Sequence, residues 1–108
     1  MEKLKFDNGM KSYRVGGGVL TFNPGDPAVY GRFLEMAEQL QTMAPADLRE
    51  ADDTIRRALG KVFPGCDLDA MFPGSLLALC GNGKLLIENF LEALEPILLE
   101  GARRYASQ

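Results

Sequence analysis

Residues 1–22 alternate between apolar and polar positions in three short runs, the first of which alternates Leu4 and Phe6 with Lys3, Lys5 and Asp7. Asn8-Gly9 separates the first two runs, and this dipeptide is the strongest short-range signal for a tight hairpin. A triple glycine separates the second run from the third. The pattern therefore predicts an antiparallel β-meander of three strands.

Beyond residue 26 the apolar period changes from two residues to between three and four, which is typical of amphipathic helices. The charged residues of the second helix, among them Asp52 and Arg56, are expected to face water. The last helix is apolar over more than one stripe, so it is expected to be either the central helix of the fold or a surface that meets another chain. The pattern predicts three main helices, over residues 27–43, 47–63 and 84–105.

The bridge between the last two helices, residues 64–83, combines proline and glycine with large apolar side chains. Because a flexible loop is rarely so apolar, short helical turns packed on the core are predicted over 68–72 and 75–79. The predicted fold class is α+β: a three-stranded antiparallel β-meander, then three main helices with short helical turns between the second and the third. Residues 1–108 are expected to form a single domain, because domains usually hold about 100–200 residues.

The overall composition is that of an ordinary globular protein, with 46% hydrophobic and 25% charged residues. The net charge is −3, and lysine and arginine are nowhere concentrated beyond two Arg-Arg pairs, so nucleic acid is not an expected partner. No stretch has the pattern of a signal peptide or of a membrane-spanning segment. A cytoplasmic protein with no membrane association is expected.

The glycine-rich stretch around Gly83-Lys84 is the most suggestive chemical motif. A phosphate-binding loop needs a glycine where this chain has Ala78, and a serine or threonine where it has Leu85. The chain therefore lacks the required residue at both ends of the motif. Asn82 is better explained as the N-cap of the last helix, and no nucleotide or other cofactor is predicted.

Catalytic and metal-binding constellations are also missing from the sequence. The chain has no histidine, so Ser75 lacks the usual base of a serine nucleophile. Cys66 and Cys80 fall short of the four ligands of a structural zinc site and are interpreted as buried structural residues. The sequence therefore predicts a protein that is not an enzyme.

Three short motifs follow one another between residues 4 and 26: Phe6-Asp7-Asn8-Gly9, Lys11-Ser12-Tyr13 and Phe22-Asn23-Pro24-Gly25-Asp26. With the helices and the bridge that follow, they resemble small proteins encoded in the tail-gene cluster of phages and prophages of Gram-positive bacteria. Proteins at this place in the cluster look like tail assembly chaperones. The resemblance implies a protein that keeps the long tape-measure protein soluble, in the bacterial host cytoplasm, while tail tube subunits assemble around it.

Two functions from different classes follow. The first is a non-catalytic assembly chaperone that binds a tape-measure or other tail protein. The alternative is a structural or adaptor subunit of a phage tail or other assembly, which self-associates through an exposed strand edge into a fixed oligomer. A third possible function, that of a small hydrolase or nucleotide-binding protein, is supported by no complete motif. Candidate partner-binding residues, each of which taken alone is better explained by core packing, are Leu86, Phe90, Leu94, Ile97, Leu98, Met71 and Phe72.

Overall fold

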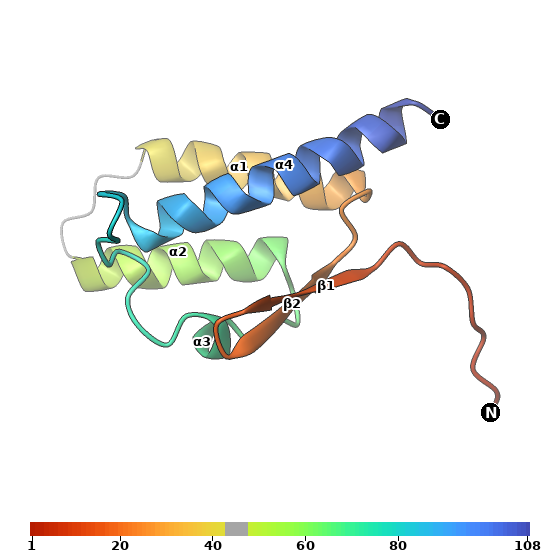
Figure 1. Cartoon of the computed structure of the whole chain (residues 1–108), viewed down its shortest axis with the longest axis horizontal. Helices are drawn as coiled ribbons and strands as arrows, with labels where there is room; N and C mark the ends of the chain where they lie inside the picture. Colours follow the sequence, from red (N-terminus) through yellow and green to blue (C-terminus); the bar gives the residue numbers. More distant parts are fainter. Residues whose placement is uncertain (43–47) are drawn as a thin grey trace.

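The computed structural model describes residues 1–42 and 48–108. The α+β class is confirmed, and within these residues the chain forms two strands instead of the predicted three, together with three long helices and one short helix in the bridge. The three long helices run side by side, and the hairpin and the short helix lie to one side of them (Figure 1). In chain order the elements are β1 (Lys11–Val15), β2 (Gly18–Phe22), α1 (Pro27–Thr42), α2 (Leu48–Val62), α3 (Leu68–Met71) and α4 (Leu86–Ala106).

The sheet is a single antiparallel hairpin in which Tyr13 of β1 lies opposite Leu20 of β2. Gly16 takes a φ of 56° at the first central position of the turn, where two-residue hairpins of type II′ place glycine. The next glycine of the turn, Gly17, donates its N–H to the carbonyl of Ala70 at 3.1 Å. The triple glycine therefore serves a turn, as its place before a strand indicated, and lets the turn approach α3 closely.

The predicted first strand is wrong, because residues 1–10 form an extended arm, called the arm below. Asp7 Oδ1 accepts a hydrogen bond from the N–H of Gly9 at 2.8 Å, and Asn8 Oδ1 accepts one from the N–H of Met10 at 3.0 Å. Such side-chain turns compete with a type I′ hairpin, which needs positive φ at both central residues. Gly9 has a φ of 74° but Asn8 does not have positive φ. The arm consequently leaves the body of the molecule (Figure 1).

Helix α1 begins where the change of period predicts it. Asp26 accepts a hydrogen bond from the N–H of Ala28 at 2.9 Å, and Pro27 occupies the first helical position, where its missing N–H costs nothing. The helix buries Val29, Phe33 and Met36, which share one face as their spacing predicts. Residues 43 and 47, at which the sequence placed the end of this helix and the start of the next, lie outside the described residues.

Helix α4 begins at Leu86, two residues after the predicted start. Asn82 is not its N-cap: the Asn82 side chain accepts from the N–H of Lys84 at 3.1 Å and donates to the side chain of Asn89 at 2.8 Å. The cap position belongs to Leu85, whose N–H donates to the carboxylate of Glu88 at 3.0 Å. Glu88 thus closes the first turn of the helix from within.

The far end of α4 lies directly against the loop between β2 and α1. Gly101 is buried, and a Cβ atom at this position would lie 1.8 Å from the carbonyl oxygen of Pro24. A glycine is required here because the two backbones are in contact. This contact fixes α4 relative to α1, against which it packs.

The bridge differs in part from its prediction. The turn expected over 68–72 is present as α3, whose N-cap Asp67 accepts from the N–H of Ala70 at 3.1 Å. Residues 75–79 are not helical: the N–H of Ala78 donates to the carbonyl of Ser75 at 3.3 Å, and Leu79 pairs with Leu85 in an isolated β-bridge. The segment instead crosses the surface of α2, to which its main chain is bonded.

Candidate protein-binding site

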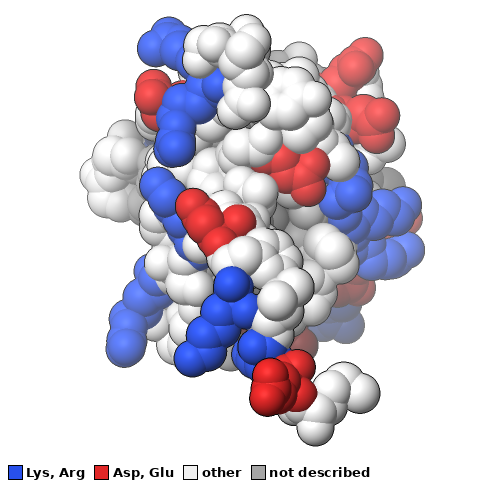
Figure 2. All heavy atoms as spheres, turned by 90° about the vertical axis from the view of Figure 1, so that its right-hand side faces the viewer, with Lys and Arg blue, Asp and Glu red and all other residues white. Residues whose placement is uncertain are grey.

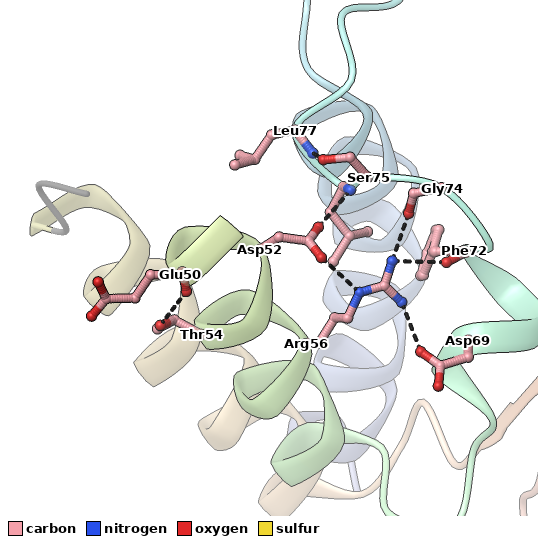
Figure 3. A network of polar contacts seen from close by, with 10 residues as sticks. Glu50, Asp52, Thr54, Arg56, Asp69, Phe72, Gly74, Ser75 and Leu77 are labelled. Carbon is pink, nitrogen blue, oxygen red and sulfur yellow. Dashed lines mark hydrogen bonds and ion pairs between the residues drawn. The ribbon is translucent and has the colours of Figure 1, made fainter. Parts of the chain in front are cut away.

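The guanidinium of Arg56, on α2, holds four oxygen atoms of three segments (Figure 3). Its Nε lies 2.9 Å from Asp52 Oδ2 on the same helix, and Nη1 lies 3.1 Å from Asp69 Oδ1 of α3. Its Nη2 donates to two main-chain carbonyls of the bridge, Phe72 at 2.8 Å and Gly74 at 2.6 Å. Charge-assisted hydrogen bonds of this kind are stronger than neutral ones and position the groups they join.

The other carboxylate oxygen of Asp52 accepts a hydrogen bond from the N–H of Leu76 at 2.8 Å. Burial raises the pKa of Asp52, but the hydrogen bonds from Leu76 and Arg56 and the charge of Arg56 outweigh it, so the pKa lies below its ordinary value of 3.8. The Asp52 and Arg56 side chains are each 18% exposed. The expectation that both face water is therefore wrong, because the bridge covers this face of α2.

The bridge is also bonded to the start of α4. The N–H of Ile87 donates to the carbonyl of Leu76 at 2.9 Å, and the N–H of Leu86 donates to the carbonyl of Ala78 at 2.8 Å. Leu77 lies between these two bonded residues, so both of its neighbours are held by main-chain hydrogen bonds. The polar network and these bonds together place Leu77 beside the gap between α1 and α4.

That gap is an apolar hollow of about 420 Å³. Its floor is buried: Ile55 is 2% exposed and Ile87 is 5% exposed. Half-buried apolar side chains form its walls, and the exposed Gln41 and Glu88 lie at its rim. The volume is in the range of about 300–1,000 Å³ that is usual for ligand sites. The residues of the apolar hollow are Ala37, Leu40, Gln41, Ile55, Leu77, Leu85, Ile87, Glu88 and Leu91.

None of the seven residues proposed from the sequence as partner contacts lines this hollow. Four of them are buried in the hydrophobic core, namely Met71, Phe72, Leu94 and Leu98. In this conformation they contact the protein's own core, not a partner. The other three, Leu86, Phe90 and Ile97, are half-buried and pack against the core. The rings of Phe72 and Phe90, for example, meet edge to face with centroids 4.9 Å apart.

The sequence contained a partial signal for the hollow. Leu40 continues the apolar face of α1 beyond its buried residues, and Leu91 lies at the edge of the apolar face of α4. Both are half-buried. Leu77 belongs to the apolar bridge, but its position over α2 depends on the contacts of Arg56 with the main chain, which no spacing rule predicts.

Charged groups on the face in Figure 2 are of both signs and lie among uncharged residues. Ser75, considered above as a nucleophile, accepts a hydrogen bond from the N–H of Leu77 at 3.1 Å. Cys66 and Cys80 are both half-buried free thiols. Within residues 1–42 and 48–108, no three histidine, cysteine or acidic side chains are grouped as metal ligands.

No helix in the described parts of the chain combines the length and apolarity needed to cross a bilayer. In comparisons with known proteins, no protein-family model, curated protein or solved structure matches the chain.

Proposed function

We propose that this protein is a non-catalytic assembly chaperone that binds an apolar helical segment of a tape-measure or other phage tail protein in the cytoplasm of a bacterial host. The apolar hollow is the single observation that carries this proposal. The partner class comes from the resemblance of residues 4–26 to proteins of the tail-gene cluster.

The shape and chemistry of the hollow suit a helix of another protein. Leu40, Leu77, Leu85 and Leu91 offer apolar area above a floor that is already buried. A groove of this kind accepts the apolar face of an amphipathic helix, whose side chains enter at intervals of three or four residues. The polar groups of Gln41 and Glu88 are at the rim, where they stay in water when the apolar area is covered.

One wall of the hollow is in place before any partner binds. The wall residue Leu77 belongs to a segment that Asp52 and Arg56 bind through its main chain. A preformed wall lowers the entropy lost on binding, because less of the site must be ordered at that moment. A chaperone that binds its partner without catalysing a reaction requires only such an apolar surface.

The test is coexpression of the chain with a tape-measure fragment that is insoluble alone. The wild-type chain is expected to keep the fragment in solution. Leu40→Asp and Leu91→Asp place a charge in the walls of the hollow, and each is expected to reduce the soluble fragment at least about tenfold, because a desolvated unpaired charge opposes binding.

The matched control is Leu34→Asp, which introduces the same charge on the same helix. Leu34 is 50% exposed and does not line the hollow, so this variant is expected to act like wild type. Circular dichroism checks that each variant is folded. Equal precipitation of the fragment with and without the wild-type chain would contradict the proposal.

The second candidate is a structural or adaptor subunit that self-associates into a fixed oligomer. The outer edge of β1 favours it, because among the described residues no main-chain group pairs with that edge. An oligomer that persists on dilution in light scattering is the expected result. A chain that is monomeric at every concentration would exclude this candidate.

A further inference from the structure

The arm has the alternating sequence of a β-strand, but it pairs with no strand that the structure describes in its own chain. Leu4 is 82% exposed and Phe6 is 71% exposed, and between and around them are charged residues. Residues 1–6 make no hydrogen bond to any other residue that the structure describes. An extended, unpaired segment with alternating apolar side chains is suited to adding to a sheet edge.

The two edges of the hairpin are not equivalent. Val15 and Gly18 flank the two-residue turn and form a hydrogen-bonded pair, so the main chain of Ser12 and Arg14 is directed away from β2. On the opposite edge, the outward carbonyl of Thr21 accepts from the thiol of Cys66 at 3.8 Å, and α3 packs there. On the β1 edge, Ser12 and Arg14 have no main-chain partner within residues 1–42 and 48–108.

The side chains of β1 define the register in which a strand can join. Ser12 faces solvent, where its hydroxyl lies 2.9 Å from that of Thr21. Tyr13 and Val15 face the other side and are half-buried, and Tyr13 stacks on the buried Phe22 with ring centroids 5.6 Å apart. The apolar face of the sheet is therefore fully covered at β2 and only half covered at β1.

The arm matches this edge in polarity. When Lys5 pairs in antiparallel orientation with the outward-directed main chain of Arg14, and Asp7 with that of Ser12, Phe6 lies opposite Tyr13 and Leu4 lies opposite Val15. A slip of one residue would place both apolar side chains in water, so the apolar pattern selects the register. The lysines near Arg14 repel it weakly across the exposed face, which the apolar pairs on the other face outweigh.

The arm of the same chain is not directed to this edge. The turns at Asp7 and Asn8 lead it away from β1, and the side-chain amide of Asn23 donates to the carbonyl of Asn8 at 3.3 Å, which holds that turn. A second copy has the same arm and the same open edge. Reciprocal exchange between two copies satisfies both edges with one twofold axis.

We propose that the arm of each copy adds as an antiparallel strand to β1 of a second copy, with Leu4 and Phe6 covering the apolar face at Tyr13 and Val15. The inference deepens the self-associating candidate above, on which it rests, by naming the strand that fills the edge. The product is a closed dimer with two three-stranded sheets. The three-stranded sheet that the alternation predicts is then formed between chains.

The test is sedimentation velocity over a dilution series of the full chain and its variants. Wild type is expected to be a dimer. Deletion of residues 1–6, and the double variant Leu4→Asp/Phe6→Asp, are expected to be monomers at concentrations where wild type is dimeric. Lys3→Gln/Lys5→Gln alters the opposite face of the same arm and is expected to retain the dimer.

The edge is tested separately from the arm. Ser12→Pro removes the outward N–H of β1 without removing a bond to β2, and it is expected to abolish the dimer. Mixed with the chain that lacks residues 1–6, the Ser12→Pro chain is expected to form a heterodimer, because one copy supplies an arm and the other an open edge. Circular dichroism confirms that the helices of each variant are intact.

Two results would overturn the inference. One is a wild-type chain that remains monomeric, which also removes the self-associating candidate. The other is a dimer that persists with unchanged affinity after deletion of residues 1–6, in which case self-association stands but uses another surface. Leu40→Asp is expected to retain the dimer, so that failure of the chaperone proposal is seen only in the coexpression assay.

Discussion

The bridge and the arm are both irregular segments, but only the bridge is held to the helices by main-chain hydrogen bonds. Four residues of the bridge are bonded through their main chain to α2 or to the start of α4, namely Phe72, Gly74, Leu76 and Ala78. Residues 1–6 of the arm are bonded to nothing described and carry exposed apolar side chains. Regular patterning therefore does not by itself order a segment. Order comes from main-chain groups that find partners.

Arg56→Ala is the change that should most weaken the bridge. It leaves the carbonyls of Phe72 and Gly74 and the Oδ2 atom of Asp52 without their donor, so the free energy of unfolding is expected to fall by about 3 kcal/mol. Urea unfolding followed by circular dichroism measures it. Arg57→Ala, an exposed arginine one position along the same helix, should change stability by less than about 0.5 kcal/mol. Equal losses in the two variants would show that the bridge does not depend on Arg56.

Asp52→Asn should have a smaller and pH-dependent effect. At neutral pH the amide loses the ionic contact with Arg56, so a loss of about 1–2 kcal/mol in the free energy of unfolding is expected. Because the folded pKa of Asp52 lies below its ordinary 3.8, the stabilisation is present above that value and is lost as the pH falls through the folded pKa. The difference from wild type should therefore shrink as urea unfolding is repeated from about pH 6 to about pH 2.5. A constant difference would contradict this account.

Deletion of residues 1–6 should have the smallest effect on the folded monomer. The removed residues make no hydrogen bond to any residue in 1–42 or 48–108, and their side chains are all exposed, so the free energy of unfolding is expected to change by less than about 0.5 kcal/mol. The measurement is made at a concentration where wild type is monomeric, since any dimer adds stability by mass action. A loss above about 1 kcal/mol would mean that the arm packs on the body in solution.

Helix positions were predictable because their signal is local. The spacing of Val29, Phe33 and Met36 identifies the buried face of α1, and Asp26-Pro27 marks its start. The same local logic found α3. It failed at Asn82, because the residue that closes the first turn of α4 is Glu88, whose side chain reaches back to Leu85.

The candidate site was less predictable than the fold. Apolar residues of the core and of a binding surface look alike in a sequence, which is why Leu94 and Leu98 were proposed as contacts and proved to be buried. The side chains that wall the hollow come from three separate parts of the chain. Their proximity is a property of how the helices pack.

Local sequence was sufficient for the α+β class, the buried face of α1 and the turn at Gly16, since each depends on residues within a few positions of one another. Tertiary structure alone decided that Arg56 holds the bridge, that Leu77 walls a hollow and that the arm leaves its own sheet. The physical reason is that hydrogen-bond partners distant in sequence compete for the same main-chain groups. The partner that each main-chain group acquires depends on the packing that brings the two together.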